Sequence, residues 1–217
     1  MFKVDFGKKE CSVDGKRSYS DKAEWISCGF FHKESVRGVN LKKQNLQGLF
    51  FSRSSLEKAK FTNVDLRGAD LWGSSLRGIR FVESDLSQME LGWADIIDAT
   101  FKGSNLSGSL FKGSRFKDVT FVDVDLHNAQ MQGVDLQDVE FVRVNLKGVS
   151  LDGASLKDVR FEGVQYDMTT SWPGDFDLEL LNQAPRTYGV WWAAGLVLGL
   201  ALGLGILFLW LKKRKFH

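Results

Sequence analysis

A large apolar side chain recurs at every fifth residue of this chain, without interruption, from Leu41 to Tyr166. The 26 positions of the series are Leu41, Leu46, Phe51, Leu56, Phe61, Leu66, Leu71, Leu76, Phe81, Leu86, Leu91, Ile96, Phe101, Leu106, Phe111, Phe116, Phe121, Leu126, Met131, Leu136, Phe141, Leu146, Leu151, Leu156, Phe161 and Tyr166. An α-helix repeats its apolar face about every 3.6 residues and a β-strand about every 2, so a period of five fits neither. The pattern instead predicts a coil that turns a corner every five residues and points one large side chain inward each time.

Two further positions share this register. The residue two before each large one is mostly small or β-branched, as at Ala59 and Val64, and residues two apart on an extended chain lie on the same side. Of the 13 glycines between residues 36 and 166, 12 stand two after a large apolar residue, and only Gly92 is out of phase. Because glycine tolerates a left-handed corner, each unit is expected to send one large and one small side chain inward and then turn.

A longer period of 20 residues is superimposed on the period of five. Every twentieth residue from Phe61 to Phe161 is phenylalanine, and every twentieth residue from Leu46 to Leu146 is leucine. If four units make one coil, residues 20 apart stack on the same wall. A repeat that buries its apolar side chains only by stacking on its neighbours is typical of a solenoid.

Units such as VDLRG (64–68), ADLWG (69–73) and VNLKG (144–148) resemble the pentapeptide-repeat family, whose consensus reads A(D/N)LXX. The resemblance extends over about 26 units, roughly three fifths of the chain. It implies an all-β fold, a right-handed quadrilateral parallel β-helix over residues 36–166, in agreement with the period of 20.

The segments that flank the repeats are interpreted as caps. Residues 1–35 are less regular and are expected to form an N-terminal cap and a first irregular coil. Residues 167–187 contain both prolines of the chain and are expected to form a C-terminal cap and linker. The side chains expected to cover the open end of the core are Phe176, Leu178, Leu180 and Leu181.

An uncharged stretch of 24 residues, 188–211, follows the linker. As a helix rising about 1.5 Å per residue it would extend for about 36 Å, enough to cross a hydrocarbon core of about 30 Å. We therefore predict a C-terminal transmembrane helix with a basic tail at 212–217, rather than a helix buried in a core, because a thin β-helix offers none large enough. The residues expected at the membrane interface are Trp191, Trp192, Trp210, Lys212, Lys213, Arg214 and Lys215.

The predicted membrane helix carries glycines at a spacing of four, Gly195, Gly199 and Gly203. Small residues at this spacing let helix backbones approach closely, so we expect association with a second copy or with another membrane protein. Without an N-terminal apolar signal, the solenoid is expected to stay in the cytoplasm while the helix inserts last as an anchor. The basic tail argues for the opposite topology by the positive-inside rule. We favour the cytoplasmic solenoid.

Catalytic and cofactor motifs are not found in the sequence. Cys11 and Cys28 are 17 residues apart with His32 nearby, a weak metal pattern that we interpret as two reduced cysteines of a cap. No serine, cysteine or carboxylate has a histidine partner at a familiar spacing, and the glycines are corners rather than a phosphate-binding loop. The sequence therefore predicts a protein that is not an enzyme and needs no cofactor or metal.

Charge bears on a known role of the family. Some pentapeptide-repeat proteins resemble duplex DNA in shape and negative charge and bind type II topoisomerases. Such mimicry requires a strongly acidic rod, because phosphate charge dominates what a DNA-binding surface recognises. Residues 36–166 carry 17 Lys and Arg and 17 Asp and Glu, a net charge of zero. Topoisomerase binding is therefore kept only as the alternative function, and nucleic acid is not an expected partner.

Four large apolar residues occupy positions that the repeat gives to solvent. They are Phe50, Trp72, Trp93 and Leu110, in four successive coils of one predicted wall. Exposed apolar surface tends to mark an interface, and Trp is enriched at interface hot spots. Two alternatives stay open: a local bulge that turns Trp93 inward, or coverage by the N-terminal segment. The function predicted from these features is a membrane-tethered, non-catalytic scaffold that presents a rigid solenoid to a protein partner.

Overall fold

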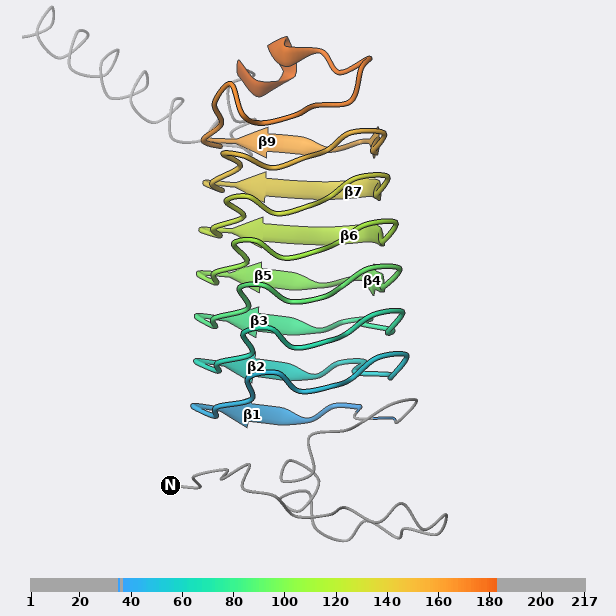
Figure 1. Ribbon diagram of the computed structural model, residues 1–217, viewed down its shortest axis with the longest axis vertical. Helices are drawn as coiled ribbons and strands as arrows, with labels where there is room; N and C mark the ends of the chain where they lie inside the picture. The colour runs from blue at the N-terminus through green and yellow to red at the C-terminus, as the bar shows by residue number, and fades with distance from the viewer. Residues whose placement is uncertain (1–34, 36, 183–217) are drawn as a thin grey trace, which may run out of the picture. The chain divides into compact units, whose positions relative to one another are not determined.

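A computed structural model describes residues 35 and 37–182, which form a stack of parallel coils (Figure 1). The elements within these residues are β1 (Asn40–Lys42), β2 (Lys60–Thr62), β3 (Arg80–Val82), β4 (Asp95–Ile97), β5 (Thr100–Lys102), β6 (Arg115–Val122), β7 (Asp135–Val142), β8 (Ser155–Lys157), β9 (Arg160–Glu162) and the 3-10 helix η1 (Leu178–Asn182). All the strands belong to one sheet, and every pairing between them is parallel.

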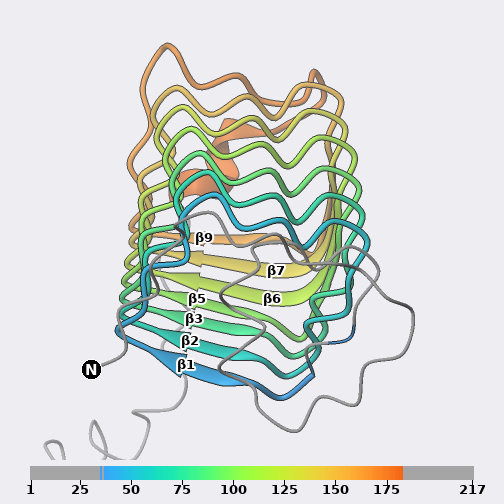
Figure 2. The same cartoon turned by 60° about the horizontal axis from the view of Figure 1, so that its bottom comes forward.

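Partners in neighbouring coils are 20 residues apart, as when Phe61 pairs with Phe81 and Phe81 with Phe101. Four such series run along the stack and define four walls, whose coils lie one over another in Figure 2. The strand wall holds β1, β2, β3, β5, the second halves of β6 and β7, and β9. The next three walls in chain order are the polar wall from Asn45 to Gln165, the aromatic wall from Phe50 to Ser171, and a fourth wall with β4 and β8. The predicted four-sided parallel solenoid is confirmed.

The interior is filled as the five-residue pattern predicts. The six phenylalanines of the strand wall stack in one column, with ring centroids 4.8–5.3 Å apart from Phe61 to Phe161. Small inward residues fill the space between the large ones, and the buried serines among them are hydrogen-bonded. Ser74, for example, donates from Oγ to the Phe51 carbonyl and accepts the Ser54 N–H. Satisfied hydroxyls can occupy the core without the cost of an unpaired polar group.

The corners have the predicted left-handed backbone. All 12 in-phase glycines have φ between 57° and 68°. Non-glycine residues at the same position also have positive φ, for example Asp98 at 52° and Asp138 at 54°. The corner geometry is thus imposed by the coil, and glycine is the residue that adopts it with least strain.

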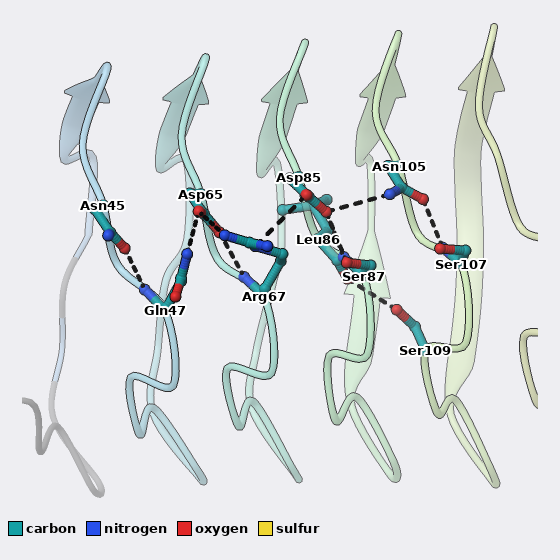
Figure 3. A network of polar contacts seen from close by, with 10 residues as sticks. All are labelled: Asn45, Gln47, Asp65, Arg67, Asp85, Leu86, Ser87, Asn105, Ser107 and Ser109. Atoms are coloured by element: carbon teal, nitrogen blue, oxygen red, sulfur yellow. Dashed lines mark hydrogen bonds and ion pairs between the residues drawn. The ribbon is translucent and has the colours of Figure 1, made fainter.

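The polar wall is organised by asparagine and aspartate side chains at equivalent places in successive coils (Figure 3). Each Oδ1 accepts the backbone N–H two residues later, at 3.2 Å from Arg67 to Asp65 and 3.1 Å from Ser87 to Asp85. Asp65 and Asp85 are stacked carboxylates, and Arg67 lies between them with its nearest nitrogens 2.8 and 3.7 Å from their oxygens. Burial raises the pKa of Asp65, but hydrogen bonds from Arg67 and Gln47 outweigh it, so the pKa lies below 3.8.

The series of inward residues ends before Tyr166, contrary to the prediction. Tyr166 is 41% exposed and packs edge-on against Trp172. One residue is inserted here, because Ser150 pairs with Ser171 rather than with residue 170. Thr170 then takes the small inward position and donates its hydroxyl to the Leu146 carbonyl at 2.9 Å.

An aromatic cap covers the end of the core at β9. Trp172 and Phe176 stack on each other at 4.6 Å, and both meet the last core phenylalanine, Phe161, edge-on. Phe176 and Leu181 pack against the core as predicted, whereas Leu178 was wrongly assigned to the cover and is 51% exposed. Trp172 takes its place, and the sequence pattern did not single it out.

Within residues 37–182, no helix is long and apolar enough to span a membrane. The predicted transmembrane helix at 188–211 and the predicted N-terminal cap, apart from residue 35, lie outside the described residues.

Candidate protein-interaction surface

The four predicted surface residues all lie on the aromatic wall, but they do not form one straight stripe. Phe50 and Leu110 belong to the same pairing series, in which Asp70 and Glu90 stand between them. Trp72 lies further along its coil and Trp93 stands at the corner. The prediction of a continuous vertical stripe is therefore wrong, because the four side chains leave the backbone at three different places in the coil.

Trp93 projects from a regular corner rather than from a bulge. Its φ is 56°, like that of the other corners, and its N–H donates to the Lys112 carbonyl of the next coil at 3.1 Å. Leu91, two residues earlier, remains in the core at 0% exposure, while Trp93 is 67% exposed. The register is thus unbroken, and the alternative of an inward-turned Trp93 is wrong. A left-handed backbone is costly for so bulky a residue.

Each tryptophan contacts a glycine of the next coil. A Cβ placed on Gly92 would lie 3.2 Å from Cδ1 of Trp72, and one on Gly113 would lie 3.1 Å from Cε2 of Trp93. Gly92 is the glycine out of phase with the corners, and its φ is not left-handed. Its small size is explained by the Trp72 ring beside it.

Arg53 completes this surface and was not predicted from the sequence. Its guanidinium carbon lies 4.8 Å from the centroid of the Trp72 ring, within the range of a cation–π interaction. To reach the ring, its side chain passes Gly73, where an added Cβ would lie 3.5 Å from Arg53 Cγ. The available signal was the 19-residue spacing, which places Arg53 beside Trp72 in successive coils. We call Arg53, Trp72 and Trp93, with the glycines beside them, the tryptophan patch.

Polar groups of the aromatic wall are held by local hydrogen bonds. Asp70 Oδ1 accepts the Trp72 N–H at 2.8 Å and fixes the backbone from which that ring departs. Nearer the cap, the hydroxyls of Ser171 and Ser150 both donate to Asp152 and lower the pKa of its carboxyl below 3.8.

The chemistry available to the tryptophan patch is contact recognition. An exposed indole offers a flat apolar surface and an N–H donor. Among the described residues, no group of three or more His, Cys, Asp and Glu is placed to hold a metal ion. Cys11, Cys28 and His32 lie outside those residues. The predicted membrane-helix and interface residues also lie outside: Gly195, Gly199, Gly203, Trp191, Trp192, Trp210, Lys212, Lys213, Arg214 and Lys215.

Two family models match the chain, and together they cover residues 37–171. A model of pentapeptide repeats in eight copies matches residues 37–73 and again 74–113. A model of a pentapeptide repeat region matches residues 94–171. No curated protein matches the sequence.

Several solved structures are similar to the chain. A trypsin-treated variant of QnrB1, a plasmid-mediated fluoroquinolone resistance protein, is 13% identical, with 64% of this chain and 89% of that one covered and a TM-score of 0.38. The pentapeptide repeat protein Rfr23 from the cyanobacterium Cyanothece 51142 is 21% identical over 64% of this chain and 91% of that one, with a TM-score of 0.26. The pentapeptide repeat protein alr5209 from Nostoc Pcc 7120 is 22% identical over 72% and 86%, with a TM-score of 0.30.

Proposed function

Because the chain belongs to the pentapeptide-repeat proteins, we propose that its solenoid is a non-catalytic scaffold that binds a protein partner through the tryptophan patch. The observation that carries this proposal is Trp93, a large apolar side chain left 67% exposed on a left-handed corner of a rigid coil. Tryptophan is among the residues most enriched at interface hot spots. The backbone beneath the ring is held by hydrogen bonds to both neighbouring coils, so the ring can bind a partner with little ordering cost.

The proposal includes a membrane tether. The uncharged stretch at 188–211 is long enough for one membrane span, and tryptophans and a basic tail flank it. We expect the solenoid on the cytoplasmic side, and the glycines at 195, 199 and 203 in contact with a second copy or another membrane helix. A partner held by the scaffold would then lie close to the bilayer.

The topoisomerase alternative is less well supported. Acidic and basic side chains balance over residues 36–166, and residues 36–80 alone carry nine basic and three acidic side chains. A DNA-like partner surface calls for negative charge along the whole rod. A supercoiling assay with a purified type II topoisomerase tests this alternative directly.

The experiment for the scaffold compares Trp93→Ala with a matched control. The full chain is purified from detergent-solubilised membranes, and proteins that accompany it are quantified by mass spectrometry. Gln88→Ala is the control, because Gln88 is also an exposed non-glycine corner with φ of 59°, but on the polar wall. We expect Trp93→Ala to lose a protein that wild type and Gln88→Ala both retain. Equal recovery with all three chains would rule out the tryptophan patch as the partner site.

A further inference from the structure

The outward face of the strand wall separates its charges into two halves. This strand face consists of the outward side chains of residues 38–43 and of the equivalent residues in each later coil, up to 163. In its first three coils the charged residues are Lys42, Lys43, Lys58, Lys60, Arg80 and Glu83, a net charge of +4. In its last four coils they are Asp98, Lys102, Asp118, Asp123, Asp138, Glu140, Arg143, Asp158, Arg160 and Glu162, a net charge of −4.

Many of these charges lack an opposite charge nearby. Among the described residues, no salt bridge involves Lys58, Lys60 or Arg80 of the basic half. The same holds in that part of the chain for Asp118, Asp138 and Asp158. These three aspartates stand at corners with φ of 54° in successive coils, and coils are spaced by about 4.8 Å. Stacked carboxylates repel one another, so a cation brought to this corner is favourable.

The middle of the strand face is partly apolar. Val82 of β3, Val122 of β6 and Val142 of β7 occupy one outward column and are half-buried. Solvent-facing positions of a sheet are usually polar, so a valine column between two charged halves suits a face that packs against another surface.

We infer that the strand face binds the strand face of a second copy of this chain, with the two solenoids antiparallel. A two-fold axis along the strand direction at the level of β5 keeps each column opposite itself and reverses the order of the coils. Lys58 then faces Asp138, and Lys60 faces Glu140. The same rotation places Val82 opposite Val122, next to the axis. A parallel arrangement would instead bring the basic half against another basic half.

This arrangement also brings a few like charges together. Glu83 meets Asp123, but the Asp123 carboxylate already accepts hydrogen bonds from Arg143 at 2.6 and 2.9 Å. Lys102 meets its own copy at the axis, and Asp123 interacts electrostatically with Lys102 within each chain. Both repulsions therefore have a counter-charge within the same chain.

The inference does not depend on the proposed scaffold function. In chain order the strand wall is followed by the polar wall and then the aromatic wall, so the strand and aromatic walls are opposite sides of the coil. A dimer through the strand face leaves the tryptophan patch of each copy uncovered. Loss of a partner in Trp93→Ala and loss of dimer contacts on the strand face are therefore separate results.

The test is thiol crosslinking between two differently tagged full-length copies in native membranes. Cys11 and Cys28 are replaced by serine, and one copy carries Lys58→Cys while the other carries Asp138→Cys. A bis-maleimide whose reach matches the spacing of packed sheets, about 10 Å, is then added. We expect a heterodimer between the two tags. The control pairs Lys58→Cys with Lys58→Cys, which the antiparallel arrangement holds apart; a dominant product there, or no heterodimer, would overturn the proposal.

Charge reversal supplies a second readout, with Val82→Cys and Val122→Cys as the crosslinking pair. Reversing Lys58 and Lys60 to Glu in both copies should lower the yield about tenfold, because like charges facing each other suppress association. Reversing Asp138 and Glu140 to Lys in both copies should do the same. Mixing one copy of each kind restores every opposite-charge contact, so the yield should return. Unchanged circular dichroism of each variant excludes misfolding, and a mixture that stays low contradicts the pairing.

Discussion

Replacing Trp93 by alanine should remove partner binding while leaving the fold nearly intact. Trp93 is 67% exposed, so only about a third of its surface is covered. A tryptophan buries up to about 250 Å², so that third is about 80 Å², and at about 25 cal/mol per Å² its loss costs at most about 2 kcal/mol. The corner backbone changes little, since alanine meets the same left-handed conformation as tryptophan.

Phe101→Ala is the comparison that gives this magnitude its meaning. Phe101 is fully buried and stacks on Phe81 at 5.3 Å and on Phe121 at 4.8 Å. A core Phe→Ala change costs about 3–5 kcal/mol, because the cavity is added to the lost burial. The predicted order is thus a clear loss of stability for Phe101→Ala and a small one for Trp93→Ala.

The assay is urea unfolding of a chain ending at residue 187, which removes the predicted membrane helix. Far-ultraviolet circular dichroism is the signal, because tryptophan fluorescence would itself change in Trp93→Ala. Similar losses for the two variants would show that the Trp93 ring belongs to the fold and would refute the reasoning. A loss below about 1 kcal/mol for Phe101→Ala would show that the phenylalanine column is not tightly packed.

Three further predictions concern register, topology and pH. One residue inserted after Phe101 moves every later side chain out of phase, so the β-sheet signal of circular dichroism should fall sharply. In intact cells, a thiol probe that cannot cross membranes should label a cysteine added after His217 and spare one at Ser107; the reverse pattern would invert the topology. A hydrogen bond from Arg143 lowers the pKa of Asp123 below 3.8, so this pair stabilises the fold above that pH and ceases to do so as pH falls through the lower folded value. In Arg143→Gln, NMR titration should return the Asp123 pKa towards 3.8, and the stability difference from wild type should shrink in acid.

The core and the register could be predicted from the sequence because both are set by one period. A side chain at Phe81 has its neighbours fixed at Phe61 and Phe101 by the 20-residue coil, and these residues pair in the structure. The left-handed corners follow in the same way, down to the aspartates that replace glycine at Asp98 and Asp138. Repetition turns a three-dimensional problem into a stack of equivalent positions.

The outward surface was less predictable, because the repeat fixes where a side chain starts but not which way it leans. The Arg53–Trp72 contact joins two different places in the coil, and the period gives no reason for it. The exit from the solenoid was missed for a related reason. A single inserted residue before Thr170 ends the period, so Tyr166 turns outward although it stands in phase.

The cap of Trp172 and Phe176 also bears on how far such a structure can grow. Every coil offers the next one a row of N–H and C=O groups, and an uncovered last coil would offer that row to any other chain with the same spacing. Edge-to-edge addition of this kind produces open-ended filaments, because the contact regenerates itself at each step. The two aromatic rings and η1 cover the core end beyond β9. Removal of residues 172–182 should therefore turn a molecule of fixed length into one that polymerises head to tail, visible as fibres by electron microscopy.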